Sequence, residues 1–115
     1  MKGVGQHLVL ELWGCSNLNS KETVEQALRD IVATIDVTLL DLKIYPFEPM
    51  GVTGAAMLAE SHIMIHTWPE HGYAAIDVFT CGKERDFQGA VDAVREHFTP
   101  ERVQAMNMVR GIVVS

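Results

Sequence analysis

The sequence predicts an α+β protein, a two-layer sandwich in which a mainly antiparallel sheet carries two helices on one face. Its 115 residues suit a single domain spanning 1–115. Only two segments show the hydrophobic period of a helix, while the other apolar segments are short or alternate as strands do. Runs of strands between only two one-sided helices favour the α+β class and leave the other sheet face free to bind something or to meet a second subunit.

The chain begins with a strand expected over 7–12. A helix follows, because apolar residues from Val24 to Ile35 recur at spacings of three and four. Its N-cap is either Asn19, paired with Glu22 in a capping box, or Ser20 one position later.

Alternation predicts the next strand over 38–45, with Leu40, Leu42 and Ile44 on one side. Prolines and a glycine end this strand. The remaining elements are expected as a strand over 55–59, an antiparallel hairpin of strands 61–68 and 73–81, a helix over 86–98 and a last strand over 102–109.

Composition narrows the class of protein. The net charge is −6 and no block of Lys or Arg occurs, which argues against a nucleic-acid surface. The N-terminus has no long apolar core, and no apolar run approaches membrane-spanning length, so neither a signal peptide nor a membrane partner is expected. Two cysteines, Cys15 and Cys81, are too few for a disulfide framework. These features predict a cytoplasmic protein with free thiols.

Reactive side chains concentrate in the hairpin. Because side chains alternate along a strand, one face of each strand is aliphatic and should meet the helices. The opposite faces should form an open, functional surface, which carries His62, Met64, His66 and Trp68 from one strand and Tyr73, Ala75, Asp77, Phe79 and Cys81 from the other.

Two general functions fit this surface poorly. His62 and His66 are separated by about 13 Å on a strand, too far to share one zinc ion, and no zinc-binding motif is present, so no metal site is expected. A serine hydrolase using Ser61 and His66 would lack the Gly-x-Ser-x-Gly elbow that exposes such a nucleophile.

The hairpin also carries one long motif. It reads Glu60-Ser61-His62-x-x-Ile65-His66-Thr67-Trp68-Pro69-Glu70, then Gly72-Tyr73-Ala74-Ala75-x-Asp77-x-Phe79-Thr80-Cys81-Gly82. Gly5-x-His7-Leu8 and Phe47-x-Pro49-x-Gly51-Val52-Thr53-Gly54 precede it. Together these segments closely resemble the small bacterial and archaeal S-adenosylmethionine decarboxylases, over nearly the whole chain.

The resemblance implies a proenzyme that cuts itself between Glu60 and Ser61, into a β chain of residues 1–60 and an α chain of residues 61–115. The Ser61 hydroxyl would attack the Glu60 carbonyl, and elimination with loss of ammonia would leave a covalent pyruvoyl group in place of Ser61. His66 matches the histidine that assists processing. Thr53 matches a hydroxyl residue that helps to bind the carbonyl oxygen.

The resemblance also implies a pyruvoyl-dependent decarboxylase. Its pyruvoyl group would form a Schiff base with the substrate, and Cys81 matches the proton donor. Phe47 and Trp68 match an adenine clamp, and Glu70 matches the carboxylate that binds the ribose. The product would be the aminopropyl donor for spermidine biosynthesis, made by a homodimer of processed protomers.

Two alternatives remain open. Relatives of this fold decarboxylate arginine or ornithine with the same chemistry. A non-processing regulatory paralogue is the other, although such a copy has no chemical need for Ser61, His66 and Cys81 together.

Overall fold

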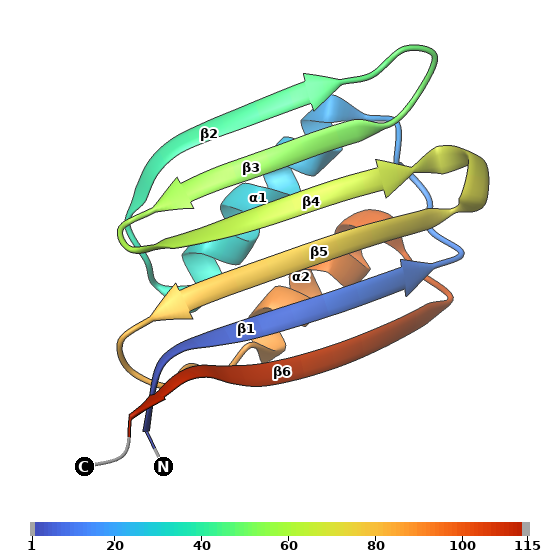
Figure 1. Ribbon diagram of the computed structural model, residues 1–115. Coiled ribbons are helices and arrows are strands. Elements are labelled where there is room, and N and C mark those ends of the chain that lie inside the picture. The colour runs from blue at the N-terminus through green and yellow to red at the C-terminus, as the bar shows by residue number, and fades with distance from the viewer. Residues whose placement is uncertain (1, 114–115) are drawn as a thin grey trace.

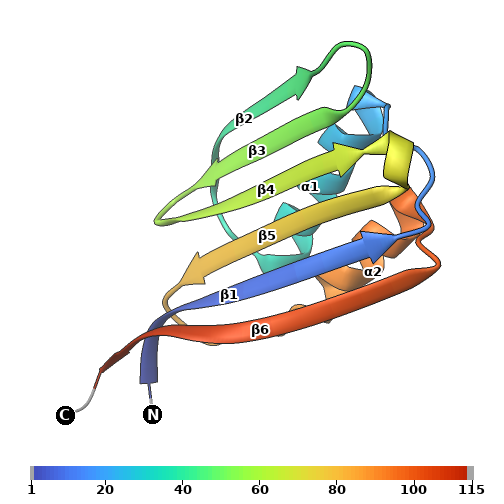
Figure 2. The ribbon, with the colours of Figure 1, turned by 45° about the vertical axis from the view of Figure 1, so that its right-hand side comes forward.

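The computed structural model describes residues 2–113, over which a six-stranded antiparallel sheet carries two helices on one face (Figures 1 and 2). This confirms the predicted two-layer α+β sandwich. Across the sheet the strands follow the order β2-β3-β4-β5-β1-β6. The elements are β1 (Lys2–Trp13), α1 (Lys21–Ile35), β2 (Leu39–Pro46), β3 (Val52–Leu58), β4 (Ser61–Trp68), the 3-10 helix η1 (Pro69–His71), β5 (Tyr73–Cys81), α2 (Gln88–Phe98) and β6 (Arg102–Val113).

Strands β4 and β5 have the predicted bounds, because regular alternation and a Pro/Gly turn mark both. Three other strands are longer than predicted. β1 begins five residues before position 7, β3 begins three residues before position 55, and β6 continues four residues past position 109. The added residues of β1 and β6 pair with each other, Gly3 opposite Ile112 and Gly5 opposite Arg110, so cross-strand pairing extends strands whose local pattern is weak.

The start of α1 resolves the choice of N-cap. The Ser20 hydroxyl accepts the N–H of Thr23 at 3.1 Å, as a capping side chain does. Asn19 instead accepts the N–H of Gly51 at 2.9 Å and so ties the helix entry to the loop before β3. Helix α2 begins two residues later than predicted.

The prediction for Leu40 was wrong. Its side chain is 64% exposed, whereas Leu42 and Ile44 pack against the core. The pairing of β2 with β3 shifts by one residue between Leu39 and Asp41, so Leu40 is an extra residue without a partner on β3. Such an extra residue interrupts the alternation of side chains, and Leu40 faces away from the core. Sequence alternation alone does not reveal this shift.

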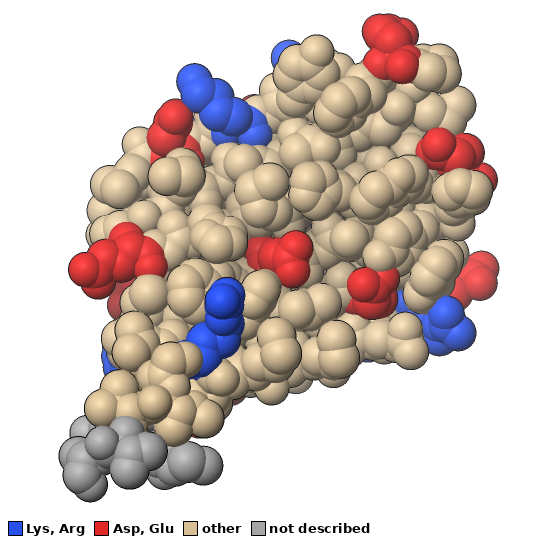
Figure 3. Space-filling model, viewed as in Figure 1, with Lys and Arg blue, Asp and Glu red and all other residues tan. Residues whose placement is uncertain are grey.

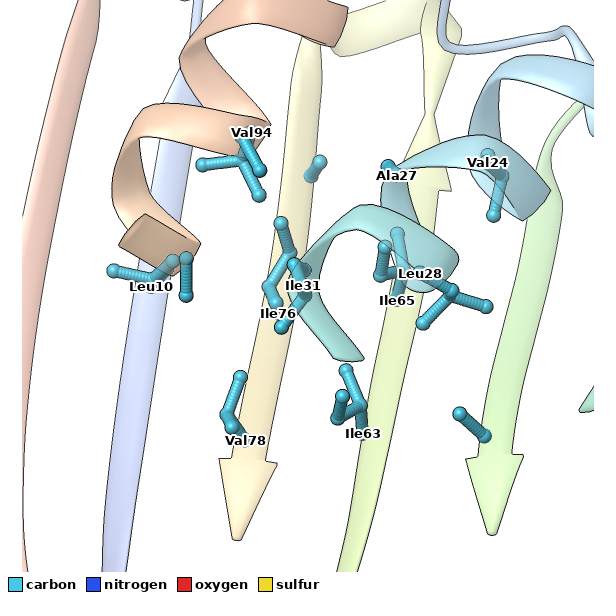
Figure 4. Packing of buried hydrophobic residues seen from close by; sticks show 14 of the residues in the cluster. Leu10, Val24, Ala27, Leu28, Ile31, Ile63, Ile65, Ile76, Val78 and Val94 are labelled. Carbon is cyan, nitrogen blue, oxygen red and sulfur yellow. The ribbon is translucent and has the colours of Figure 1, made fainter. Parts of the chain in front are cut away.

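The core lies between the sheet and the two helices. Figure 4 shows Ile31 of α1 and Val94 of α2 directed toward the sheet, where Ile76 meets them. All three are essentially inaccessible to water, and burial of each such side chain stabilises the fold by roughly 1.5–3 kcal/mol. This confirms that the aliphatic faces of β4 and β5 meet the helices.

The other sheet face is uncovered in the single chain. Figure 3 shows this face, on which uncharged side chains predominate and charged ones are scattered. Large apolar side chains are exposed on it, including Met57 at 56% and Met106 at 58%. None of the helices described in the structure is long and apolar enough to cross a membrane.

Candidate active site

The predicted cleavage bond lies in the tight turn between β3 and β4. Leu58 and Ser61 form the last cross-strand pair, so Ala59 and Glu60 make the turn. Glu60 has a φ of +63°, in the left-handed region that costs a residue with a Cβ about 1–2 kcal/mol. The Glu60–Ser61 peptide at which cleavage is predicted therefore begins with a strained residue.

Cys81 reaches this turn from the neighbouring strand. The register pairs His62 with Phe79, which brings the end of β5 beside the turn. The Cys81 Sγ lies 2.7 Å from the Glu60 carbonyl oxygen, to which the thiol donates. The Ser61 hydroxyl donates to the Ala59 carbonyl at 3.4 Å. We refer to Glu60, Ser61 and Cys81 as the turn group.

The remaining predicted residues gather at the opposite end of these strands. Phe47, Trp68 and Glu70 line a pocket of about 550 Å³, within the usual size of small-molecule sites. Thr53 and His66 line the same pocket and face each other across β3 and β4, with the Thr53 Oγ1 3.1 Å from the His66 Nδ1. We refer to these five residues as the pocket group.

Buried polar contacts that sequence reasoning missed hold the pocket group in place. Thr67 is on the helix-facing side of β4 and is 6% exposed. Its hydroxyl accepts the N–H of Val52 at 2.8 Å and donates to the Leu18 carbonyl at 2.7 Å. The signal available in the sequence was a hydroxyl residue that follows Ile63 and Ile65 on the helix-facing side of β4.

One chain does not bring the two groups together. Ser61 and His66 are five residues apart on β4, so their Cα atoms are separated by about 16 Å. Their side chains also lie on opposite faces, because Ser61 shares the alternation of the buried Ile63 and Ile65, whereas His66 belongs to the open face. Figure 1 shows the β3–β4 turn at one end of β4 and the short helix η1 at the other, and Glu70 of η1 lines the pocket.

Polar pairs occupy the open face on strands β1 and β5. The carboxylate of Asp77 on β5 has a partner in His7 of β1, whose Nε2 lies 3.2 Å from it. The Tyr73 hydroxyl donates to Glu11. Burial, then the Glu11 hydrogen bond and the charges of Glu11 and Asp77, raise the pKa of Tyr73 to about 12.

The fold places the chain in the class of small α+β decarboxylases. The solved adenosylmethionine decarboxylase from Aquifex aeolicus matches it with a TM-score of 0.89 and 35% identity, over 99% of this chain and 96% of that one.

The chain belongs to the S-adenosylmethionine decarboxylase family, which its residues 6–111 match. A protein of Thermomicrobium roseum named S-adenosylmethionine decarboxylase proenzyme is 51% identical over 115 residues, which cover 99% of each chain. One of the same name from Methanococcus maripaludis strain C7 is 46% identical over 98% of this chain and 94% of its own.

Proposed function

We propose that the chain is the precursor of an S-adenosylmethionine decarboxylase that cuts itself between Glu60 and Ser61. The printed names of its relatives include the word proenzyme. The observation that carries the proposal is the contact of the Cys81 thiol with the carbonyl of the strained residue Glu60. A donor on that oxygen polarises the carbonyl that a neighbouring hydroxyl must attack.

In the proposed cleavage, the Ser61 Oγ adds to the Glu60 carbonyl carbon. The bond from that carbon to the Ser61 nitrogen then breaks, and the hydroxyl proton passes to the nitrogen, which converts the amide into an ester. While the carbonyl oxygen carries negative charge, the Cys81 thiol stabilises it together with the Thr53–His66 pair of a second copy of the chain.

The second stage separates the chains. Loss of the Ser61 Cα proton and cleavage of its Cβ–Oγ bond release Glu60 as the C-terminal carboxylate of residues 1–60. Water then replaces the nitrogen of the remaining unsaturated residue and ammonia leaves, so residues 61–115 begin with a pyruvoyl group. His66 is the proposed base for the proton transfers.

The turn group suits a pyruvoyl group at position 61. Such a group supplies an electron-withdrawing carbonyl, which draws away the electron pair that is left on the substrate carbon when carbon dioxide departs. Cys81 lies beside this position and is the proposed donor that returns a proton to the substrate carbon.

The pocket group suits a nucleoside substrate better than arginine or ornithine. Phe47 and Trp68 are 49% and 39% exposed, so their rings are available to stack on an adenine. Exposed aromatic faces also attract a sulfonium cation. The Glu70 carboxylate lines the same pocket and can accept two ribose hydroxyls.

Carboxyl-labelled S-adenosylmethionine, arginine and ornithine, each supplied to the purified chain, test the substrate assignment. We expect labelled carbon dioxide from S-adenosylmethionine only, and none from a Ser61→Ala chain. Release from an amino acid instead would reassign the substrate class. Absence of release from all three would favour a regulatory paralogue.

The separation of the two groups supports a homodimer. Within one chain His66 is too far from Ser61 to assist its cleavage. Two copies related by a two-fold axis, with their open faces in contact, can place the pocket group of one beside the β3–β4 turn of the other, where Cys81 belongs to the open face. The same arrangement would cover the exposed Met57 and Met106, which a single chain leaves in water.

Mixing two inactive chains tests this sharing. A Ser61→Ala chain has no nucleophile, and a His66→Ala chain has no base, so each alone should remain uncut. After the two are unfolded together and refolded, the His66→Ala chain should be cut with the help of its partner's His66. Absence of cutting in the mixture, with wild-type chain refolded alongside and cut normally, would overturn the shared site.

A further inference from the structure

The segment that follows Cys81, from Gly82 to Arg85, takes no part in the proposed chemistry, but it holds the end of β5 that carries the Cys81 thiol. After Cys81 the chain leaves the sheet through Gly82, which has a φ of +88°, and crosses toward α2. The N–H of Gly82 donates to the Val4 carbonyl at 3.3 Å. A single backbone contact of this length leaves the loop dependent on other groups for its position.

Arg85 provides most of the additional contacts. Its Nη1 donates to the Cys81 carbonyl at 2.9 Å and to the Lys83 carbonyl at 3.4 Å. Its Nε donates to the Ile35 carbonyl at 3.1 Å, at the C-terminal end of α1, where the helix dipole also favours a cation. One planar guanidinium thus joins the end of β5 to the end of α1.

Gln6 of β1 holds Arg85 in turn. The Gln6 Oε1 accepts the backbone N–H of Arg85 at 2.7 Å, and the Gln6 Nε2 donates to the Arg85 carbonyl at 3.4 Å. Three elements therefore meet at one residue, β5 and α1 through the Arg85 guanidinium and β1 through the Arg85 backbone. This network therefore includes the backbone carbonyl of Cys81, the residue whose thiol contacts the Glu60 carbonyl.

We infer that Arg85, held by Gln6, is a positioning residue that fixes the Cys81 thiol on the Glu60 carbonyl. The inference rests on the proposed self-cleavage. Arg85 contacts neither the scissile bond nor the pocket group, so it acts through Cys81. Without the Arg85 guanidinium, the Cys81 carbonyl has no side-chain donor and the Cys81 thiol is no longer held against the Glu60 carbonyl.

A double-mutant cycle tests this inference, with the rate of self-cleavage as the readout. Arg85→Met should slow cleavage by about tenfold to a hundredfold, the effect of moving a reacting group by about an ångström. In a Cys81→Ala chain the same substitution should cause no further slowing. A role in stability alone would slow both chains by the same factor and would overturn the inference.

Two matched variants separate position from stability. Arg85→Lys keeps the charge but cannot span three carbonyls, so it should restore only part of the rate. Val94→Ala removes buried contacts of α2 and lowers stability without touching the network. It should cleave at the wild-type rate, and a rate that follows thermal stability across all these variants would contradict the inference.

Three further outcomes of these experiments can be told apart. If Arg85→Met does not fold, Gln6→Met enters the same cycle with the same expected outcome. If Cys81→Ala shows no cleavage at all, the comparison with Val94→Ala decides. A wild-type chain that is never cut would instead refute the proposed function.

Discussion

The contact between the Cys81 thiol and the Glu60 carbonyl predicts how strongly cleavage depends on this cysteine. The thiol lies 2.7 Å from the oxygen that would become negatively charged in the proposed attack by Ser61. Removing one donor from such an oxygen typically slows a reaction by about 10²–10³-fold. Because S–H is a weak donor, we expect a smaller effect than this, so Cys81→Ala should slow self-cleavage by about tenfold to a hundredfold.

The assay follows the conversion of freshly refolded chain into its two fragments. Cys81→Ser keeps a donor hydroxyl and should lie between the wild type and Cys81→Ala. Cys15→Ala serves as the matched control, because Cys15 lies on another loop, and it should cleave normally. Cleavage of Cys81→Ala at the wild-type rate would show that the contact has no part in processing.

Three further predictions concern the stability of the uncut chain and use a Ser61→Ala background. Thr67→Val removes a buried hydroxyl and leaves a buried N–H unpaired, so it should lower the free energy of unfolding in urea by about 2–4 kcal/mol; a loss no larger than that of Thr67→Ser would contradict this. Glu60→Gly relieves a left-handed residue and should raise that free energy by about 0.5–1 kcal/mol; unchanged stability would show that the turn is unstrained. The His97 hydrogen bond lowers the pKa of Asp30 below its ordinary 3.8, so the carboxylate stabilises the fold above that pH and the stabilisation disappears as pH falls through the lowered pKa. Asp30→Asn should abolish this part of the acid dependence in urea titrations, and an unchanged profile would count against the pair.

The sequence predicted the parts of the fold in which local pattern and tertiary environment agree. The bounds of β4 and β5 followed from alternation between a reactive face and an aliphatic face, ended by Pro69 and Gly82. Leu40 failed because a one-residue shift in strand pairing has no local signature. The first residues of β1 were missed because glycines interrupt their alternation, and it is pairing with β6, joined from Gly5 onward by pairing with β5, that makes them a strand.

The candidate site was predicted as residues but not as an arrangement. Resemblance named Ser61, His66 and Cys81 together, whereas strand geometry separates Ser61 from His66 and brings Cys81 to Glu60. That contact depends on the register between β4 and β5. Arg85 was not found because loop side chains that bind backbone carbonyls follow no sequence period.

Intact-protein mass spectrometry of the purified wild-type chain tests the central claim most directly. The account predicts two species divided between Glu60 and Ser61, with the second bearing the mass of an N-terminal pyruvoyl group. A single unmodified species of 12.8 kDa that stays whole on long incubation would contradict self-cleavage and, with it, the proposed enzyme.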